Sequence, residues 1–139
     1  MKVIITDLDL LSQLLQKGFL SLIGDGTLRI YAMLSALPAS QHSDAKSAAA
    51  QKVLTLVELD EDPYETLWLA NQDNNAVSMN QMYVIRYAMN NNMTVLCNDK
   101  VFLSVAEGFG VRAYDIDSFS LQPKSVRVKL TTIQICNLL

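Results

Sequence analysis

The chain has 139 residues, of which half are hydrophobic and 18% are charged, with a net charge of −3. These values predict a compact domain with a single core and exclude a disordered chain. The excess of acids also argues against a broad phosphate-binding surface. Acids interrupt the opening MKVIITDLDLL, and no apolar run approaches the roughly 20 residues that span a bilayer. We therefore expect a soluble, cytoplasmic protein with no membrane partner, in which residues 1–119 form the domain and residues 120–139 extend it.

The N-terminal part of the chain predicts a strand followed by a helix. Residues 2–6 are a β-branched run too short for a helix, and residues 8–23 have the apolar spacing of a helix. A turn follows at Gly24-Asp25-Gly26. Residues 28–37, which end before Pro38, fit either a helix or a segment that begins as a strand. The small, polar residues 39–47 indicate a surface loop before a helix-prone Ser-Ala-Ala-Ala-Gln sequence.

The middle of the chain predicts one strand and two helices. Residues 52–59 alternate as a strand does. Asp62, Pro63 and Glu65 are typical of a helix start, which indicates a helix over residues 63–71. Ser78 and Gln81 have the spacing of a capping box, so a further helix should begin there and end at Asn90-Asn91-Asn92.

The last third continues the alternation of strands and helices. It predicts a strand at residues 94–97, a helix at residues 100–107 with Gly108 as its C-cap, and a strand at residues 111–116. Residues 126–135 alternate as an edge strand would. Because parallel strands need crossover connections, the order of elements predicts a three-layer α/β/α fold with a central parallel sheet and a C-terminal extra strand.

Two aspartates mark the candidate functional site. Asp7 closes the first strand and Asp99 follows the strand at residues 94–97. Ligands of open α/β sheets bind at the carboxyl ends of the strands, so the two carboxylates should lie at a functional edge. Each aspartate also precedes a predicted helix, where an N-cap is a sufficient reason for its presence.

The order of these parts resembles the PIN domain, a small α/β nuclease family. VIITDLDLL resembles its opening strand and helix, Cys97-Asn98-Asp99 the end of a later strand, and Gly110-Val111 the glycine before its last strand. In that family, acids bind Mg²⁺ or Mn²⁺, which positions a water for attack on an RNA phosphodiester. The resemblance implies catalytic Asp7 and Asp99, and a metal bound by Asp7, Asp99 and Asp117.

The chain also departs from the family pattern. The family places a glutamate in the helix after the second strand, where residues 31–37 hold no acid, and an aspartate early in the serine-started helix, where Gln81 stands. Four other aspartates are candidates to replace the missing acids: Asp9, Asp44, Asp115 and Asp117. A site with two carboxylates should hold Mg²⁺ or Mn²⁺ weakly.

Three functions follow as alternatives. The first is a degenerate PIN-like domain with reduced or lost nuclease activity that works as a binding or regulatory module. The second is an active ribonuclease of toxin–antitoxin type, with RNA, an antitoxin-like protein or a second copy of the chain as partner. The third is a phosphatase of the haloacid dehalogenase type, because Asp7-Leu8-Asp9 resembles its D-x-D pair.

Other residue types are interpreted structurally. Cys97 and Cys136 lie in apolar runs and should be reduced core residues. His42 lies in the predicted polar loop without a second ligand, and Trp68 has helical apolar spacing typical of a core residue. The basic residues near the C-terminus should form a solvated strand face; they are Lys124, Arg127 and Lys129.

Overall fold

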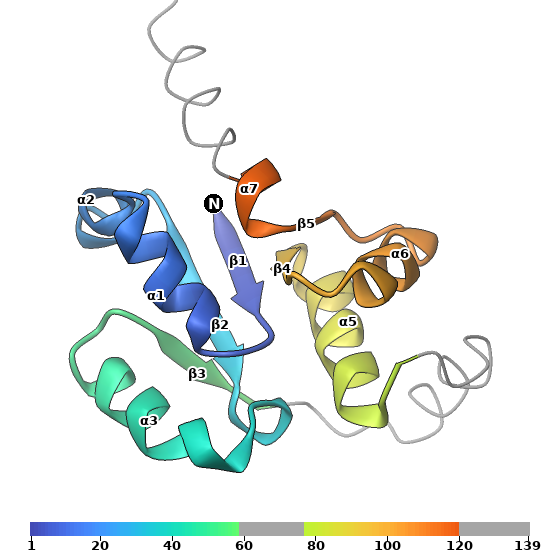
Figure 1. Ribbon diagram of the computed structural model, residues 1–139, viewed down its shortest axis with the longest axis horizontal. Coiled ribbons are helices and arrows are strands. Elements are labelled where there is room, and N and C mark those ends of the chain that lie inside the picture. Colours follow the sequence, from blue (N-terminus) through green and yellow to red (C-terminus); the bar gives the residue numbers. More distant parts are fainter. Residues whose placement is uncertain (59–76, 120–139) are drawn as a thin grey trace, which may run out of the picture.

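The computed structural model describes residues 1–58 and 77–119 as an α/β fold with a five-stranded, all-parallel sheet in the order β3-β2-β1-β4-β5. Helices flank the strands on both faces, which confirms the predicted three-layer architecture (Figure 1). The strands are β1 (Lys2–Ile5), β2 (Arg29–Met33), β3 (Thr55–Val57), β4 (Thr94–Leu96) and β5 (Ala113–Tyr114). The helices are α1 (Asp9–Gln16), α2 (Leu20–Gly24), α3 (His42–Ala50), α5 (Met79–Asn91), α6 (Lys100–Gly108) and α7 (Ile116–Phe119), with short 3₁₀ turns η1 (Leu34–Ala36) and η2 (Ala39–Gln41).

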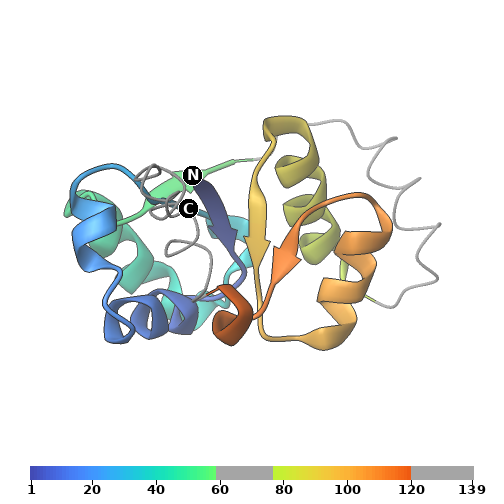
Figure 2. The same cartoon turned by 90° about the horizontal axis from the view of Figure 1, so that it is seen from above.

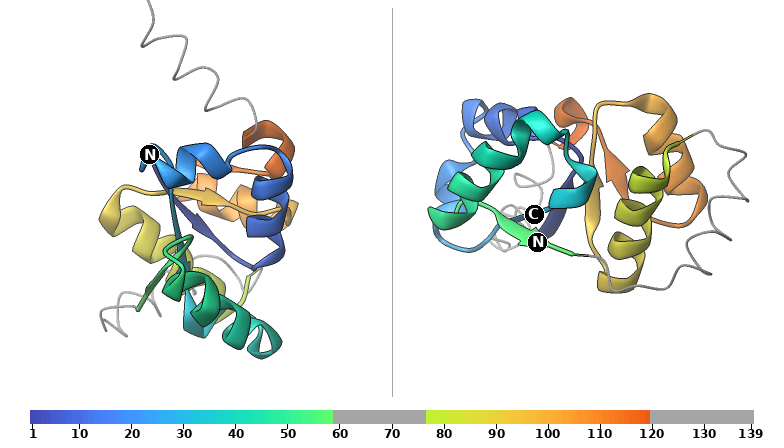
Figure 3. Two further views of the ribbon diagram at one scale, coloured as in Figure 1. Left: turned by 90° about the vertical axis from the view of Figure 1, so that its left-hand side faces the viewer. Right: turned by 90° about the horizontal axis from the view of Figure 1, so that it is seen from below.

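Alternate residues of β1 pack against opposite helical layers. Val3 and Ile5 face the layer of α1, α2, α3 and α7, which we call the α1 face. Ile4 faces the layer of α5 and α6, which we call the α5 face. All three side chains are essentially inaccessible to solvent, as expected for a parallel strand covered on both sides. Figure 2 and the right-hand view of Figure 3 show the two layers on opposite sides of the strands.

The sheet has a topological switch point between β1 and β4. The helix that follows β1 is α1, whose Leu10 and Leu14 belong to the α1 face. The helix that follows β4 is α6, whose Phe102 belongs to the α5 face. β1 and β4 pair directly, with Ile5 opposite Leu96. Two neighbouring strands whose following helices leave to opposite faces create a crevice at their carboxyl ends, where open α/β sheets bind ligands.

The first predicted helix is wrong in its length. The structure breaks residues 8–23 into α1 and α2, and Gly18 between them has a φ of +89°. Glycine adopts this left-handed conformation without steric cost, so the chain turns there and still packs apolar residues of both helices on the sheet. Phe19, the residue after Gly18, packs edge-on against Phe119 with ring centroids 5.8 Å apart.

The predicted loop at residues 39–47 is also wrong. Residues 39–41 form η2 and residues 42–50 form α3. The helix carries an acid, Asp44, in its first turn and buries Ala45 completely against the α1 face. Small side chains permit this close packing, although their weak apolar periodicity does not indicate it in the sequence. The open alternative at residues 28–37 is resolved as strand β2 followed by η1.

Further boundaries differ by a few residues. Of the strand predicted over residues 52–59, the described residues 52–58 form a strand only in β3, because Lys52 has a φ of +63° and lies in the turn after α3. The helix predicted to be capped by Gly108 includes that glycine, and the left-handed residue is Gly110, with a φ of +82°. The strand predicted over residues 111–116 is confined to β5, after which α7 begins at Ile116.

The predictions for α5 and β4 are confirmed. Ser78 and Gln81 form the complete capping box of α5, which ends at Asn91 with left-handed Asn92 behind it. β4 coincides with the predicted strand to within one residue. The predicted helix at residues 63–71, the strand at residues 126–135, Trp68, Cys136 and the three basic residues near the C-terminus lie outside the described residues. Within residues 1–58 and 77–119, no helix has both the length and the hydropathy to cross a membrane.

Candidate functional site at the switch point

A pocket of about 550 Å³ lies at the carboxyl ends of β1 and β4, and both candidate aspartates line it. Asp7 follows β1 and Asp99 follows β4, so the pocket coincides with the switch point. Figure 1 shows α1 beginning where the arrow of β1 ends. The full lining is Thr6, Asp7, Ala36, Leu37, Pro38, Ser78, Asn80, Gln81, Val84, Cys97, Asn98 and Asp99.

Both aspartates also stabilise the start of a helix. Asp99 is the N-cap of α6, and its Oδ1 accepts hydrogen bonds from the backbone N–H groups of Val101 at 3.0 Å and Phe102 at 3.4 Å. Oδ1 of Asp7 accepts from the N–H of Leu10 in α1 at 3.3 Å. The N-cap predicted as the alternative is therefore confirmed for Asp99. The N-cap of α1 is Leu8, so Asp7 stands one residue before the cap and still accepts an N–H of the helix. A cap and a ligand site are compatible, because each carboxylate has two oxygens with several lone pairs.

Asp7 is the more desolvated acid. Partial burial raises the pKa of its carboxyl group above the usual value, the Leu10 N–H opposes this shift, and the negative charge of Asp9 adds to it. The buried Cys97 lies in the same pocket, and its Sγ accepts the N–H of Asp99 at 3.4 Å. Burial raises the pKa of the Cys97 thiol, so it is neutral, as predicted for a reduced core cysteine.

Three helices begin at or within two residues of side chains that line this pocket. Asp7 precedes α1, Asp99 precedes α6, and Ser78 is the N-cap of α5. Each helix start carries about half a positive charge from its unpaired N–H groups. These three partial charges oppose the two carboxylates. The pocket is consequently less attractive to a divalent cation than a count of its acids suggests.

Gln81, at which the sequence resemblance led us to expect an aspartate, lines the pocket. Its Oε1 accepts the backbone N–H of Ser78 at 2.8 Å, while Ser78 Oγ accepts the N–H of Gln81 at 3.2 Å. The carbonyl oxygen of Gln81 is thus already bonded within the capping box. Ala36, Leu37 and Pro38 also line the pocket and contribute no charge, and we call them the Pro38 wall.

The other candidate acids lie elsewhere. Asp117 Oδ1 is 3.4 Å from Lys17 Nζ on an exposed surface, and Asp115 Oδ1 accepts the N–H of Ser118 at 2.7 Å. Asp9 stands in the first turn of α1 and Asp44 in that of α3. None of the four lines the pocket. Within residues 1–58 and 77–119, no three His, Cys, Asp or Glu side chains come together as metal ligands.

His42 has a structural contact. It begins α3, and its Nε2 lies 3.1 Å from the carbonyl oxygen of Leu37. The placement of His42 in a loop is therefore wrong, because η2 leads directly into α3. The contact joins the first helical residue to the wall of the pocket.

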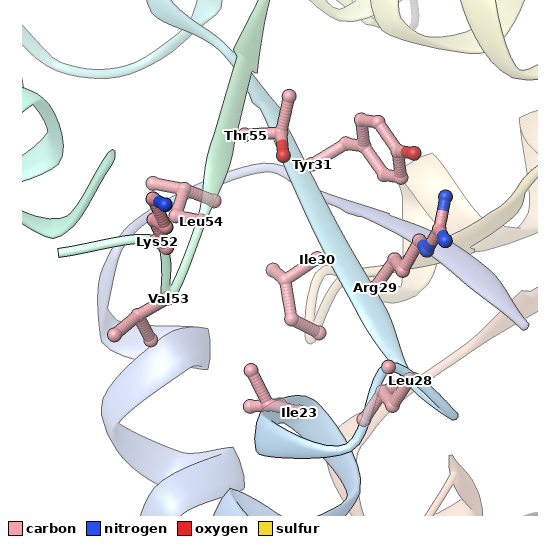
Figure 4. A pocket seen from close by; sticks show the side chains of 10 residues that line it. Ile23, Leu28, Arg29, Ile30, Tyr31, Lys52, Val53, Leu54 and Thr55 are labelled. Carbon is pink, nitrogen blue, oxygen red and sulfur yellow. The ribbon is translucent and has the colours of Figure 1, made fainter. Parts of the chain in front are cut away.

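A second pocket, of about 260 Å³, lies beside the first residues of β2 and the segment that leads into β3. Figure 4 shows Leu28 and Ile30 on one side of β2 and Arg29 and Tyr31 on the other, as strand alternation requires. Lys52 lies away from Arg29 in the same view. The two cations do not converge, so this pocket lacks an evident anion site.

Comparisons with known proteins support the fold alone. No family model matches the chain, and no curated protein sequence matches it. The structure is similar to the crystal structure of PAE2754 from Pyrobaculum aerophilum, with a TM-score of 0.58 and 12% sequence identity. The similarity covers 90% of this chain and 96% of that one. At this identity it shows a shared α/β fold, and function has to be argued from the site.

Proposed function

We propose that this chain is a PIN-like domain whose metal-dependent nuclease activity is reduced or lost, and that its switch-point pocket serves as a binding or regulatory site. The proposal rests on the resemblance of the sequence to that family together with the composition of the pocket. Asp7 and Asp99 line it from neighbouring strands, whereas Gln81 supplies an amide at the position of a third acid.

The observation that carries the proposal is the hydrogen bond that the side-chain carbonyl oxygen of Gln81 accepts within the capping box. A glutamine that offered its carbonyl oxygen to a metal would partly replace the lost carboxylate. Here that oxygen already accepts the Ser78 N–H at 2.8 Å, so one of its two lone pairs is used within the capping box. Two carboxylates remain against three helix N-termini, which supports weak cation binding and little stabilisation of charge on a leaving oxygen.

Mn²⁺ titration of the purified chain tests the metal half of the proposal. We expect weak binding in the wild type and weaker binding in Asp7→Asn and Asp99→Asn. Gln81→Glu should bind Mn²⁺ more tightly, because glutamate preserves the capping box and adds a carboxylate. Asp117→Asn is the matched control, since this acid does not line the pocket and its removal should leave the affinity unchanged. Tight binding by the wild type would contradict the proposal.

An RNA cleavage assay with Mg²⁺ or Mn²⁺ tests the catalytic half. We expect slow or absent cleavage by the wild type, with a gain in Gln81→Glu. Efficient cleavage that disappears in both Asp7→Asn and Asp99→Asn would establish the active ribonuclease instead. Cleavage that survives both substitutions would come from a contaminant and leave the chain inactive, as proposed.

The partners belong to the same proposal. We expect RNA, an antitoxin-like protein or a second copy of this chain to bind, within the cytoplasm. A mobility-shift assay with single-stranded RNA, and light scattering of the purified chain, separate these alternatives. Binding that is unaffected by Asp7→Asn and Asp99→Asn would locate the contact outside the switch-point pocket.

A further inference from the structure

Gln41 connects two walls of the switch-point pocket. Its side-chain Oε1 accepts the backbone N–H of Leu8 at 2.8 Å, across 33 positions of sequence. Its backbone N–H donates to the carbonyl oxygen of Pro38 at 2.9 Å. Leu8 directly follows Asp7, and Pro38 lines the wall of the pocket that has no acid.

The fold gives Gln41 this position. It is the last residue of η2 and the N-cap of α3, where its backbone leaves the 3₁₀ turn and enters the helix. The neighbouring His42 holds the Leu37 carbonyl at 3.1 Å, so the segment is fixed on both sides of Pro38. A partly buried glutamine side chain is thereby directed at the loop that carries Asp7.

The Leu8 N–H needs such a partner. It lies at the entrance to α1, where the first N–H groups of a helix have no acceptor within the helix. Leaving a partly buried N–H without an acceptor is costly, so the Asp7 loop and the Pro38 wall are held at the separation that this bond requires. The start of α1 thus has acceptors from two parts of the chain. Asp7 accepts the Leu10 N–H, and Gln41 accepts the Leu8 N–H.

We propose that Gln41 is a positioning residue that sets the distance between the Asp7 loop and the Pro38 wall, and hence the width of the pocket available to a ligand. The inference rests on the proposed function only in taking this pocket as the functional site. Gln41 does not line the pocket and acts through Leu8 and Pro38.

The test compares the wild type with Gln41→Met and Gln41→Glu. Methionine has a similar length but no oxygen acceptor, and glutamate preserves the acceptor. In Gln41→Met we expect amide hydrogen exchange at Leu8 to accelerate about tenfold, while exchange at Leu14 in the middle of α1 does not change. Crystal structures should show the Asp7 loop and Pro38 further apart. In Gln41→Glu, both the protection of the Leu8 amide and the distance between the Asp7 loop and Pro38 should stay as in the wild type.

Each contrary outcome is informative. Unchanged exchange at Leu8, or an unchanged separation of Asp7 and Pro38 in Gln41→Met, would overturn the inference. Equal acceleration at Leu8 and Leu14 would also overturn it, since that pattern means a general loss of α1 stability. All measurements are made without RNA or metal, so they fail or succeed independently of the proposed function.

Discussion

The side-chain amide of Asn98 donates a hydrogen bond to Oε1 of Gln13 at 3.0 Å, which joins the loop after β4 to helix α1. Oδ1 of the same asparagine accepts the backbone N–H of Ile116 at 3.0 Å. Asn98 stands next to Asp99 and lines the pocket. The Asn98 side chain therefore links the loop after β4 both to helix α1 and to the start of α7.

Replacing Asn98 should cost more stability than replacing its partner. Asn98→Ala leaves the partly buried Ile116 N–H without its acceptor, for which we expect a loss of about 1–3 kcal/mol. Gln13→Ala removes only the exposed bond and introduces a strong helix former, so its loss should stay below about 1 kcal/mol. Urea denaturation measures both variants. Equal losses would mean that the Ile116 contact contributes nothing.

Asp7 should make stability fall as the pH rises. Burial raises the pKa of its carboxyl in the folded protein above the unfolded value, so the folded state binds a proton more tightly. Stability from this group is fully present below the unfolded pKa and is lost as the pH passes through the folded pKa. We expect Asp7→Asn to match the wild type near pH 3 and to exceed its stability at pH 7.

Asp115 is the control of opposite sign. The Ser118 N–H, which it accepts at 2.7 Å, lowers the pKa of its carboxyl. Its contribution is present above the unfolded pKa and is lost as the pH falls through the folded pKa. Asp115→Asn should therefore lose stability relative to the wild type at pH 7 and lose none in strong acid. Thermal unfolding over this pH range checks both variants, and parallel pH profiles for the two would contradict the assignments.

Two nearby glycines should respond to alanine in opposite directions. Gly110 has a φ of +82°, and Gly110→Ala should cost about 1–2 kcal/mol because alanine is strained in the left-handed region. Gly108 ends α6, and Gly108→Ala should stabilise by about 0.5–1 kcal/mol, since alanine restricts the unfolded chain and favours the helix. An added Cβ meets nothing within 4 Å at either site, so conformation alone separates them. Denaturation curves with the same sign for both would refute this account.

Cys97 should resist alkylation in the folded protein. Its side chain is buried, and burial raises the pKa of the thiol, which removes the reactive thiolate. We expect iodoacetamide to modify it at least about a hundredfold more slowly in buffer than in urea, because reaction requires unfolding. Mass spectrometry of the peptide that contains Cys97 measures the rate. Rapid modification of the native protein would show that Cys97 becomes accessible from the pocket without unfolding.

Residues with strong local signals were predictable. Ser78 and Gln81 predict the start of α5, because a capping box is formed by residues only three positions apart. The apolar run of β1 and its closing Asp7 likewise follow from a short, β-branched segment that can be covered on both faces. The placement of both aspartates at one edge follows from the parallel order of the strands.

The secondary-structure predictions were wrong where tertiary packing decides the local conformation. Residues 42–50 lack a clear apolar stripe, and they form α3 because Ala45 packs closely on the sheet. The pattern over residues 8–23 is continuous in the sequence, yet Gly18 turns the chain between α1 and α2. In both cases a local pattern was weaker than the contacts that the folded chain makes elsewhere.

The sequence by itself determined the alternation of strands and helices, the capping of α5, and the presence of an aspartate after each of two buried strands. These are properties of residues close together in the chain. Only the tertiary structure decided that Asp7 and Asp99 share a pocket without Asp117, that the Gln81 carbonyl is already bonded, and that Gln41 reaches across to Leu8. Each of these depends on where separate segments meet, which is set by core packing and strand order rather than by local pattern.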